Sequence, residues 1–516
     1  MDKTYDAILL GGTLLDGTIS EPRVADIGIR GDKIAMIGQI SGQAEKVIDA
    51  TGMIITPGFI DVHTHCDVTF MRSQSFAERI KDIPSWKGNW NYLYQGVTTV
   101  VTGNCGQGYA DADHWLETVN SLKFGTNVYH LAPHGQIRRE VLGDDQPAAL
   151  TSSQLDALKK RVAEVMEMGA IGLSTGLVYA PGFLAQTGEI IELAKVAAKY
   201  GGLYATHIRD ESGLLYDDGR RGVCRAIEEA LEIGVKAEIP VEISHLKISS
   251  PIDGMNARMI LELIEEARQK GFDVTADQYP YDAGSSHLTL LVPPDFLKAD
   301  GVKEEYRTKE GRKEIRKAIE AVFSHLAPEK ILISEYRDNR EFEGKNLQEI
   351  AEIEGREPSE LFADMVASER PPLGVFFSQD MNIVSDIMPN SYIMTGSDGW
   401  TTFKGILKPH PRCYGTFPRK IRKFVLEKKL QNLTSAVRSM TSLPAEKFNL
   451  KGRGRLRSGC FADIAVIDLD RITDRATYLD PHQYAEGIQY LFVNGVLSID
   501  QGKATGVEAG RGLRRS

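Results

Sequence analysis

Short apolar runs alternate with amphipathic stretches through the middle of the chain. Eight of these runs are candidate strands, at residues 59–63, 97–102, 127–131, 170–174, 203–207, 241–245, 272–277 and 392–397. Helical periodicity separates several of them, and in residues 155–168 it places one apolar face along Leu155, Leu158, Val162, Val165 and Met166. Strands that alternate with helices are typical of βαβ units, and eight parallel strands close a TIM barrel. The pattern therefore predicts an α/β fold with a (β/α)₈ TIM barrel.

Both ends of the chain show a different pattern, of short strands separated by turn signals. Near the N-terminus these strands are expected at residues 7–10, 26–29 and 33–37, and the same pattern returns at residues 463–468 and 490–495. We therefore expect a small β-sandwich domain built from both termini, residues 1–57 plus 452–516. It would flank a barrel domain at residues 58–451.

The spacing between the last two barrel strands is too wide for a simple connection. About a hundred residues separate the seventh candidate strand from the eighth. They hold a charged helix at residues 303–323 and strand-like runs at 330–334 and 374–378. Because long barrel loops are usually functional, we interpret this segment as an insertion, at approximately residues 288–372, that acts as a lid.

Composition and charge exclude some classes of binding partner and indicate the cellular compartment. The 516-residue chain has a net charge of −10, whereas a nucleic-acid surface needs a basic excess. The N-terminal residues lack a signal-peptide pattern, and no apolar run approaches the ~20 residues of a membrane span. The five cysteines are odd in number and scattered, at Cys66, Cys105, Cys224, Cys413 and Cys460. We therefore expect a cytoplasmic protein without a disulfide framework, in which a cysteine with a special role is a ligand or a nucleophile.

Residues that can bind metals fall at the ends of the predicted strands. Four histidines, one cysteine and one aspartate share this placement: His63, His65, Cys105, His207, His245 and Asp398. The carboxyl ends of barrel strands converge on one face, where catalytic residues of such barrels lie. Nitrogen, sulfur and oxygen donors together suit Zn²⁺. Each residue alone is weak evidence, but the ordered series predicts a zinc site.

The chain resembles the amidohydrolase superfamily at its first barrel strand and the N-acyl-D-amino-acid deacylase (D-aminoacylase) branch beyond it. The first match is ITPGFIDVHTH at residues 55–65. The later matches, in order, are GVTTVV (96–101), GNCG (103–106), STGLVYAPG (174–182), SHLK (244–247), DQYPY (277–281), GSDG (396–399), HPR (410–412) and GTFPR (415–419).

This resemblance implies a set of residue roles. Cys105 takes the place of the carboxylated lysine of hydantoinase-like relatives and holds a tight zinc with His207 and His245. His63, His65 and Asp398 form a second metal site that is weaker or empty. The implied substrate contacts are Tyr179, Lys247, Arg412 and either Ser285 or Ser286. The position of Cys66 varies in the family, and we expect no ligand role there.

The expected reaction is zinc-dependent hydrolysis of the amide bond of N-acyl-D-amino acids. Zinc polarises a carbonyl and makes bound water more acidic, and Asp398 is the candidate general base. Lys247 and Arg412 would bind the substrate carboxylate, and Tyr179 would donate to that carboxylate or to the developing oxyanion.

Three alternatives share the fold. A cyclic amidase of the hydantoinase or dihydroorotase type lacks support, because Cys105 occupies the place of the bridging lysine. A D-specific dipeptidase would differ only in its substrate. A non-catalytic scaffold would be expected to lose ligands, and none of the six is missing.

Overall fold

The computed structural model describes residues 5–71, 85–143, 146–250, 254–298, 301–404 and 408–515. Parallel strands occupy the centre of the molecule, in two hydrogen-bonded arcs. The first arc, in spatial order, is β6 (Phe59–Asp61), β7 (Val97–Thr102) and β8 (Asn127–His130). The second arc is β9 (Ala132–Pro133), β10 (Gly172–Gly176), β11 (Leu203–His207), β12 (Val241–Ile243), β13 (Val274–Gln278) and β19 (Ile393–Thr395).

These arcs account for all eight candidate strands, since β8 and β9 are separated only by Leu131. Backbone contacts connect the arcs at both ends. The N–H of Ile171, just before β10, donates to the carbonyl of His130 at 2.9 Å. At the other end, Thr64 and Gly399 form a parallel bridge, and the N–H of Asp398 donates to the carbonyl of His63 at 2.8 Å. The first and last strands therefore end side by side.

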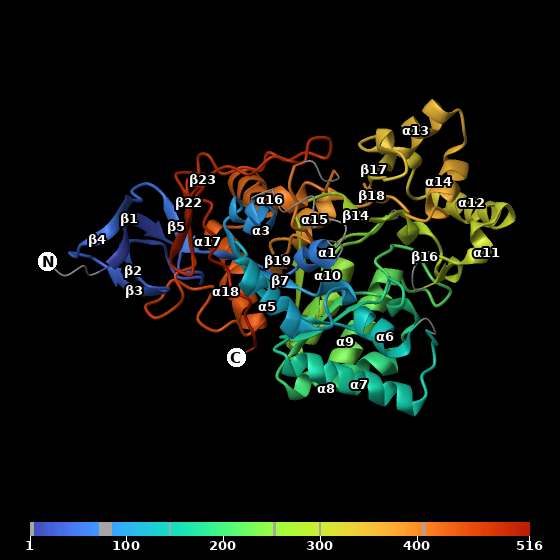
Figure 1. Ribbon diagram of the computed structural model, residues 1–516, viewed down its shortest axis with the longest axis horizontal. Helices are drawn as coiled ribbons and strands as arrows, with labels where there is room; N and C mark the ends of the chain where they lie inside the picture. The colour runs from blue at the N-terminus through green and yellow to red at the C-terminus, as the bar shows by residue number, and fades with distance from the viewer. Residues whose placement is uncertain are drawn as a thin grey trace.

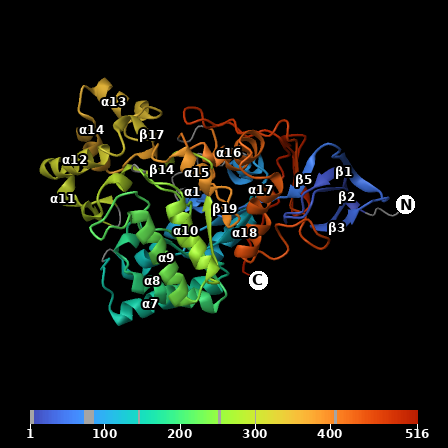
Figure 2. The same ribbon diagram turned by 180° about the vertical axis from the view of Figure 1, so that it is seen from behind.

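Helices pack around these strands and bury their apolar faces against them. Those between the strands are α1 (Cys66–Met71), α3 (Ser85–Gly88), α4 (Trp90–Leu93), α5 (Ala112–Leu122), α6 (His134–Leu142), α7 (Ser152–Glu167), α8 (Thr187–Lys199), α9 (Gly222–Ala237), α10 (Arg258–Gln269) and α15 (Met381–Ile387). After β19 follow α16 (Arg412–Arg419), a π-helix (Lys420–Glu427), α17 (Leu433–Met440) and α18 (Ser442–Lys447). Figure 1 shows α6 to α9 along one side of the molecule, and Figure 2 shows α10 beside them.

The helix expected at residues 155–168 is α7. It begins at Ser152 because Thr151 and Gln154 form a capping box that satisfies the first free N–H groups. Its side chains Leu158, Val162, Val165 and Met166 are buried, as the periodicity predicts. Among the described residues, no helix is both long and apolar enough to span a membrane.

Strands from the two ends of the chain form one sheet. The N-terminal strands are β1 (Tyr5–Leu14), β2 (Arg23–Arg30), β3 (Lys33–Gly38), β4 (Ala44–Asp49) and β5 (Ile54–Pro57). The C-terminal strands are β20 (Ile464–Ile467), β21 (Ile488–Val493), β22 (Val496–Asp500) and β23 (Lys503–Ala504). The antiparallel pair of β5 and β20 joins the two sets, so the nine strands make a single sheet in place of the two sheets of a sandwich. Figure 1 shows this sheet at one end of the molecule.

The segment between β13 and β19 forms a second projection, at the opposite end of the molecule (Figures 1 and 2). Its strands are β14 (Gly284–His287), β15 (Leu297–Lys298), β16 (Gly301–Val302), β17 (Ile331–Glu335) and β18 (Leu373–Phe376). Its helices are α11 (Glu304–Arg307), α12 (Lys309–Phe323), α13 (Leu347–Glu354) and α14 (Pro358–Val366). An apolar core of its own includes Ile315, Ile331 and Phe362.

The prediction of one continuous helix at residues 303–323 is wrong. The chain leaves the helical conformation at Thr308, which separates α11 from α12. The Thr308 hydroxyl accepts a hydrogen bond from the N–H of Gly311 at 3.1 Å, so this residue caps the second helix.

Candidate metal centre

Six side chains converge at the carboxyl ends of the parallel strands. They form three overlapping groups in which the ligand atoms lie within 4.8 Å of one another: His63, His65 and Cys105; Cys105, His207 and His245; and His63, His245 and Asp398. All six residues that the sequence singles out as metal ligands thus lie in one small volume.

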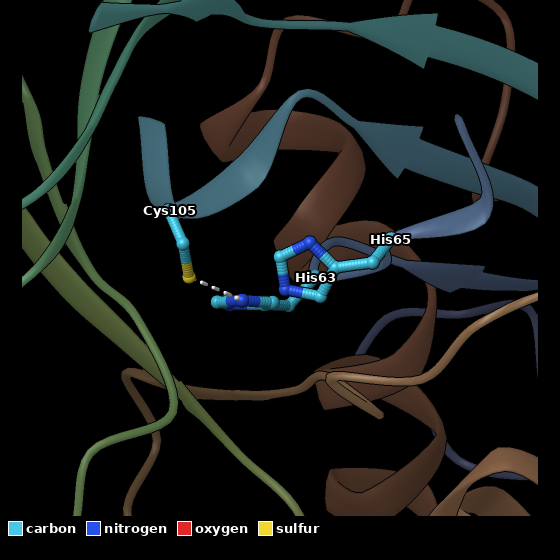
Figure 3. Close-up of side chains that lie close together, drawn as sticks. All are labelled: His63, His65 and Cys105. Carbon is cyan, nitrogen blue, oxygen red and sulfur yellow. Dashed lines mark hydrogen bonds between the residues drawn. The ribbon is translucent and has the colours of Figure 1, made fainter. Parts of the chain in front are cut away.

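The Cys105 sulfur faces three of the histidines. It lies 3.3 Å from Nε2 of His63 and 3.7 Å from both Nδ1 of His207 and Nε2 of His245. Figure 3 shows this sulfur directed at the His63 ring, with His65 beside that ring. Burial alone would raise the pKa of the Cys105 thiol, but the facing histidines lower it well below its ordinary value. These histidines therefore favour the thiolate, the form that binds metals.

Asp398 is contacted on both of its carboxylate oxygens. Oδ1 lies 3.1 Å from Nε2 of His65 and 3.7 Å from Nε2 of His63, and Oδ2 lies 2.8 Å from Nη1 of Arg412. Burial alone would raise the pKa of Asp398, but Arg412, His245 and His65 hold it well below its ordinary value. Asp398 is consequently ionised at neutral pH and can accept a proton.

The backbone of this site is strained at three of the six positions. Cys105, His245 and Asp398 have φ values of 54°, 34° and 50°, in the left-handed region that favours glycine. Each such residue costs about 1–3 kcal/mol, and such outliers cluster at functional sites. Gly396 is constrained by space, because a Cβ there would lie 2.4 Å from Oδ1 of Asp277. The turn after β19 can therefore pass Asp277 only without a side chain at this position.

Two carboxylates that hold the histidines have no assigned role in the sequence prediction. Asp277 Oδ2 lies 3.1 Å from Nδ1 of His63. Glu211 lies 3.1 Å from Nδ1 of His245 and 3.4 Å from Nε2 of His207. Asp277 shares the sequence signal of the predicted ligands, because it lies at the end of a barrel strand, as the second-to-last residue of β13. Glu211 follows β11 in an irregular loop, where no sequence pattern marks it.

The residues predicted to contact substrate surround the same volume. The Tyr179 ring packs edge-on against His207, with ring centroids 4.7 Å apart. Nζ of Lys247 lies 2.5 Å from Glu211, and Arg412 is ion-paired with Asp398. Burial raises the pKa of Tyr179 well above its ordinary value, so its hydroxyl keeps its proton and can donate it in a hydrogen bond.

A cleft of about 1290 Å³ opens beside these residues. Tyr179 and Ser286 both line it. Ser285 is not among its lining residues; its backbone carbonyl lies 3.4 Å from Nη2 of Arg412 and accepts a hydrogen bond from it. Adjacent residues of a strand point to opposite faces, and both serines lie in β14. The geometry therefore favours Ser286 as the serine that faces a ligand in the cleft.

Cys66, His134 and His287 lie outside the three ligand groups. Cys66 is buried, with its sulfur 3.8 Å from the amide nitrogen of Asn89, and burial raises its thiol pKa to about 11. His134 pairs with Glu189 at 2.9 Å, and His287 lines the cleft. A neutral Cys66 thiol agrees with the expectation that this residue has no ligand role.

The donor set fits zinc. Imidazole nitrogen, thiolate sulfur and carboxylate oxygen are the ligands that Zn²⁺ accepts, and three protein ligands suffice for a catalytic site with an open position. Nδ1 of His207 and Nε2 of His245 both face the Cys105 sulfur, each at 3.7 Å. The imidazole, thiolate and carboxylate groups can therefore hold one metal ion, or two that share Cys105.

The chain is similar to known proteins over nearly its whole length. A profile of the amidohydrolase family matches residues 46–230 and 392–499. The D-aminoacylase of Alcaligenes xylosoxydans xylosoxydans is 34% identical, over 99% of this chain and 98% of the relative. The N-acyl-D-glutamate deacylase of the same organism is 33% identical, over 100% of this chain and 98% of the relative.

A similar crystal structure has also been solved. It is the N-acyl-D-glutamate deacylase of Bordetella bronchiseptica, complexed with zinc and a phosphonate inhibitor that mimics the tetrahedral intermediate of the reaction. It superposes on this chain with a TM-score of 0.83 and 32% sequence identity, covering 99% of this chain and 100% of that one.

Proposed function

The chain belongs to the amidohydrolase family, and we propose that within it the chain acts as a zinc-dependent N-acyl-D-amino-acid deacylase. It hydrolyses the linear amide bond of an N-acyl-D-amino acid and releases a carboxylate and the free D-amino acid. The observation that carries this conclusion is the six-residue group at the strand ends, in a chain that matches deacylases over its whole length.

We assign the tight zinc to Cys105, His207 and His245. A second, weaker metal would take His63, His65 and Asp398. The thiolate character of Cys105 and its distances to both histidines support the first site. Zinc, when bound, polarises the amide carbonyl and lowers the pKa of bound water.

Asp398 is the proposed general base. Its carboxylate accepts the proton of the attacking water and then donates that proton to the leaving nitrogen, which departs as an amine. The ion pair with Arg412 keeps Asp398 ionised before the reaction.

Cations and hydroxyls around the site bind the rest of the substrate. Arg412 and Lys247 attract its carboxylate, since an arginine can offer two parallel N–H groups and a lysine offers a point charge. The protonated Tyr179 hydroxyl and Ser286 donate hydrogen bonds from the wall of the cleft.

The preferred substrate side chain is apolar. The cleft beside Tyr179 is walled by Phe183 and by the apolar residues 290–294 of the segment after β14. Arginines that line the described part of the cleft already have partners within the protein. The pairs are Arg139 with the carbonyl of Ala180, Arg209 with Glu229, Arg220 with Asp218, and Arg225 with Asp218. A second carboxylate on the substrate would compete with these contacts, whereas an apolar group would not.

The fold proposal follows from the same contacts. We infer that the two arcs close into one eight-stranded barrel at residues 58–451, because Thr64 and Gly399 bridge its first and last strands. The joint sheet supports a small β-domain of residues 1–57 plus 452–516. The separate apolar core supports an insertion at approximately residues 288–372.

We also propose a cytoplasmic enzyme whose partner is a small-molecule substrate, with neither a nucleic acid nor a membrane as a partner. Cys105 binds a metal only as a reduced thiolate, which supports a reducing compartment. The net charge of −10 supports the exclusion of nucleic acid.

A substrate panel tests the proposed function. Paired D and L forms of N-acetyl-leucine, N-acetyl-phenylalanine and N-acetyl-glutamate would be assayed with zinc-loaded protein, beside hydantoins, dihydroorotate and D-dipeptides. We expect the highest kcat/KM for N-acetyl-D-leucine or N-acetyl-D-phenylalanine. Faster hydrolysis of hydantoins or dihydroorotate would make the protein a cyclic amidase, faster hydrolysis of dipeptides would make it a dipeptidase, and preference for N-acetyl-D-glutamate would overturn the apolar assignment alone.

A further inference from the structure

One carboxylate lies behind two of the three residues assigned to the tight zinc. Glu211 Oε1 is 3.1 Å from Nδ1 of His245, and Glu211 Oε2 is 3.4 Å from Nε2 of His207. The opposite nitrogen of each ring faces the Cys105 sulfur, Nε2 in His245 and Nδ1 in His207. The two rings thus stand between the same thiolate and the same carboxylate.

The position of Glu211 is fixed by backbone contacts. Its own carbonyl accepts a hydrogen bond from the N–H of Ser249 at 2.8 Å, and Ser212 and Ser249 form a parallel bridge. Ser249 belongs to the loop that follows β12 and His245. The loop that carries Glu211 is therefore attached to the loop beyond the second histidine, and the Glu211 side chain is only 11% exposed.

An imidazole that binds a metal through one nitrogen carries its proton on the other. An acceptor at that second nitrogen fixes both the tautomer and the orientation of the ring, and an ionised carboxylate is the strongest such acceptor in a protein. His207 and His245 need opposite tautomers, because they face Cys105 through Nδ1 and Nε2 respectively. The two oxygens of Glu211 can accept from both.

We propose that Glu211 is a positioning residue that holds His207 and His245 in the tautomers and orientations that bind zinc. The proposal rests on the proposed function for the identity of the metal. The competing explanation is that Glu211 only neutralises Lys247, whose Nζ lies 2.5 Å from Oε1 of Glu211 and 2.8 Å from Nδ1 of His245, the same nitrogen that faces Glu211. The two explanations differ in what the loss of Lys247 does to zinc binding.

The test of this role of Glu211 measures zinc affinity rather than hydrolysis. Wild-type protein, E211Q, E211D and K247M would be stripped with a chelator, checked for folding by circular dichroism, and titrated with zinc against a chromophoric chelator. The matched control is E189Q, because Glu189 is a buried carboxylate that pairs with a histidine, His134, outside the ligand groups. In E211Q, the amide places a donor group where one ring N–H needs an acceptor.

We expect E211Q to weaken zinc binding by about 10- to 100-fold, the usual effect of losing such a partner. E211D should recover part of this loss, and E189Q and K247M should stay within about threefold of wild type. Zinc affinity of E211Q equal to that of wild type would overturn the proposal, as would an equal loss in K247M or E189Q. If E211Q does not fold, E211D decides: the proposal requires weaker zinc binding in E211D than in E189Q. A wild-type protein that binds zinc but hydrolyses no N-acyl-D-amino acid would refute the proposed function and leave this inference standing.

Discussion

Asp398 has contacts that suit a base and not only a ligand. Its Oδ1 faces His65, whereas its Oδ2 is ion-paired with Arg412 at 2.8 Å. Because the tight zinc is assigned to three other residues, D398N should lower kcat by about 10²- to 10⁴-fold and leave one zinc bound. Steady-state kinetics and zinc content of the same preparation check this. Near-normal turnover would remove Asp398 as the base, and loss of all zinc would place it in the tight site.

Arg412 is the residue assigned to the substrate carboxylate. It is buried, and its guanidinium stacks 4.8 Å from the centre of the Tyr279 ring. R412M should therefore reduce kcat/KM for N-acetyl-D-leucine by at least 10-fold more than for N-acetyl-D-leucinamide, which lacks the charge. R412K keeps a positive charge without the planar fork, so its loss of kcat/KM for N-acetyl-D-leucine should lie between those of wild type and R412M. An equal loss for the acid and its amide would show that Arg412 acts only through Asp398.

At the residue scale, the sequence predicts which side chains meet but not what holds them. His63, His65, Cys105, His207 and Asp398 are recognisable because each lies at or just after the end of an apolar run. Asp277 could have been found by the same rule. Glu211 could not, because its role depends on a loop-to-loop contact with Ser249, and single-sequence patterns carry no signal for such a contact.

At the element scale, periodicity locates the buried strands and the long helices better than it locates exposed strands and helix boundaries. Strands β7 and β11 match the predicted ranges residue for residue, because both are buried throughout. The sequence pattern does not reveal strand β4, since most of its residues are exposed and it forms by pairing with β1. The pattern also does not reveal the break at Thr308, because a threonine cap inside a charged amphipathic stretch barely alters the helical period.

The π-helix begins at a buried lysine, Lys420, and none of the described aspartates or glutamates lies within ion-pair distance of it. Lys420 Nζ donates to the hydroxyls of Thr395 in β19 and Ser439 in α17, at 3.0 and 2.8 Å. Burial lowers its pKa from 10.5 to about 7. Between these two values the unfolded chain binds more protons than the folded protein, so this residue makes the free energy of unfolding rise with pH.

The expected contribution of Lys420 is roughly 1.4 kcal/mol per pH unit between pH 7 and 10. Urea unfolding of wild type and K420M at pH 7, 8.5 and 10 measures it, because all other titrating groups are shared. The free energy of unfolding should rise with pH more steeply in wild type than in K420M. Parallel pH profiles would show that the lysine keeps its proton in the folded protein.

At the scale of the whole molecule, a buried polar network joins the terminal sheet to the barrel. Arg453 is ion-paired with Asp463, and its Nη2 donates to Oδ1 of Asn494 at 2.9 Å. Asn494 in turn donates to Oδ1 of Asn127 in β8 at 2.7 Å. R453M would leave the Asp463 carboxylate buried without its partner and should cost about 3–5 kcal/mol.

Chemical denaturation checks this prediction, with R511M as the control. Arg511 forms an exposed pair with Asp32 at 2.7 Å and should contribute no more than about 1 kcal/mol. An R453M variant as stable as R511M would show that the network does not stabilise the junction. The sequence predicts that both termini form β-structure, but not the junction with the barrel, because Asn494 and Asn127 are 367 positions apart.

X-ray absorption at the zinc edge tests most directly whether one thiolate and two histidines hold the catalytic zinc. Wild-type protein with one zinc bound should show a single sulfur neighbour at about 2.3 Å, with nitrogen or oxygen neighbours at about 2.0–2.1 Å. In C105S the sulfur signal should disappear. A wild-type spectrum with only nitrogen and oxygen neighbours, or an unchanged spectrum in C105S, would contradict zinc binding by Cys105.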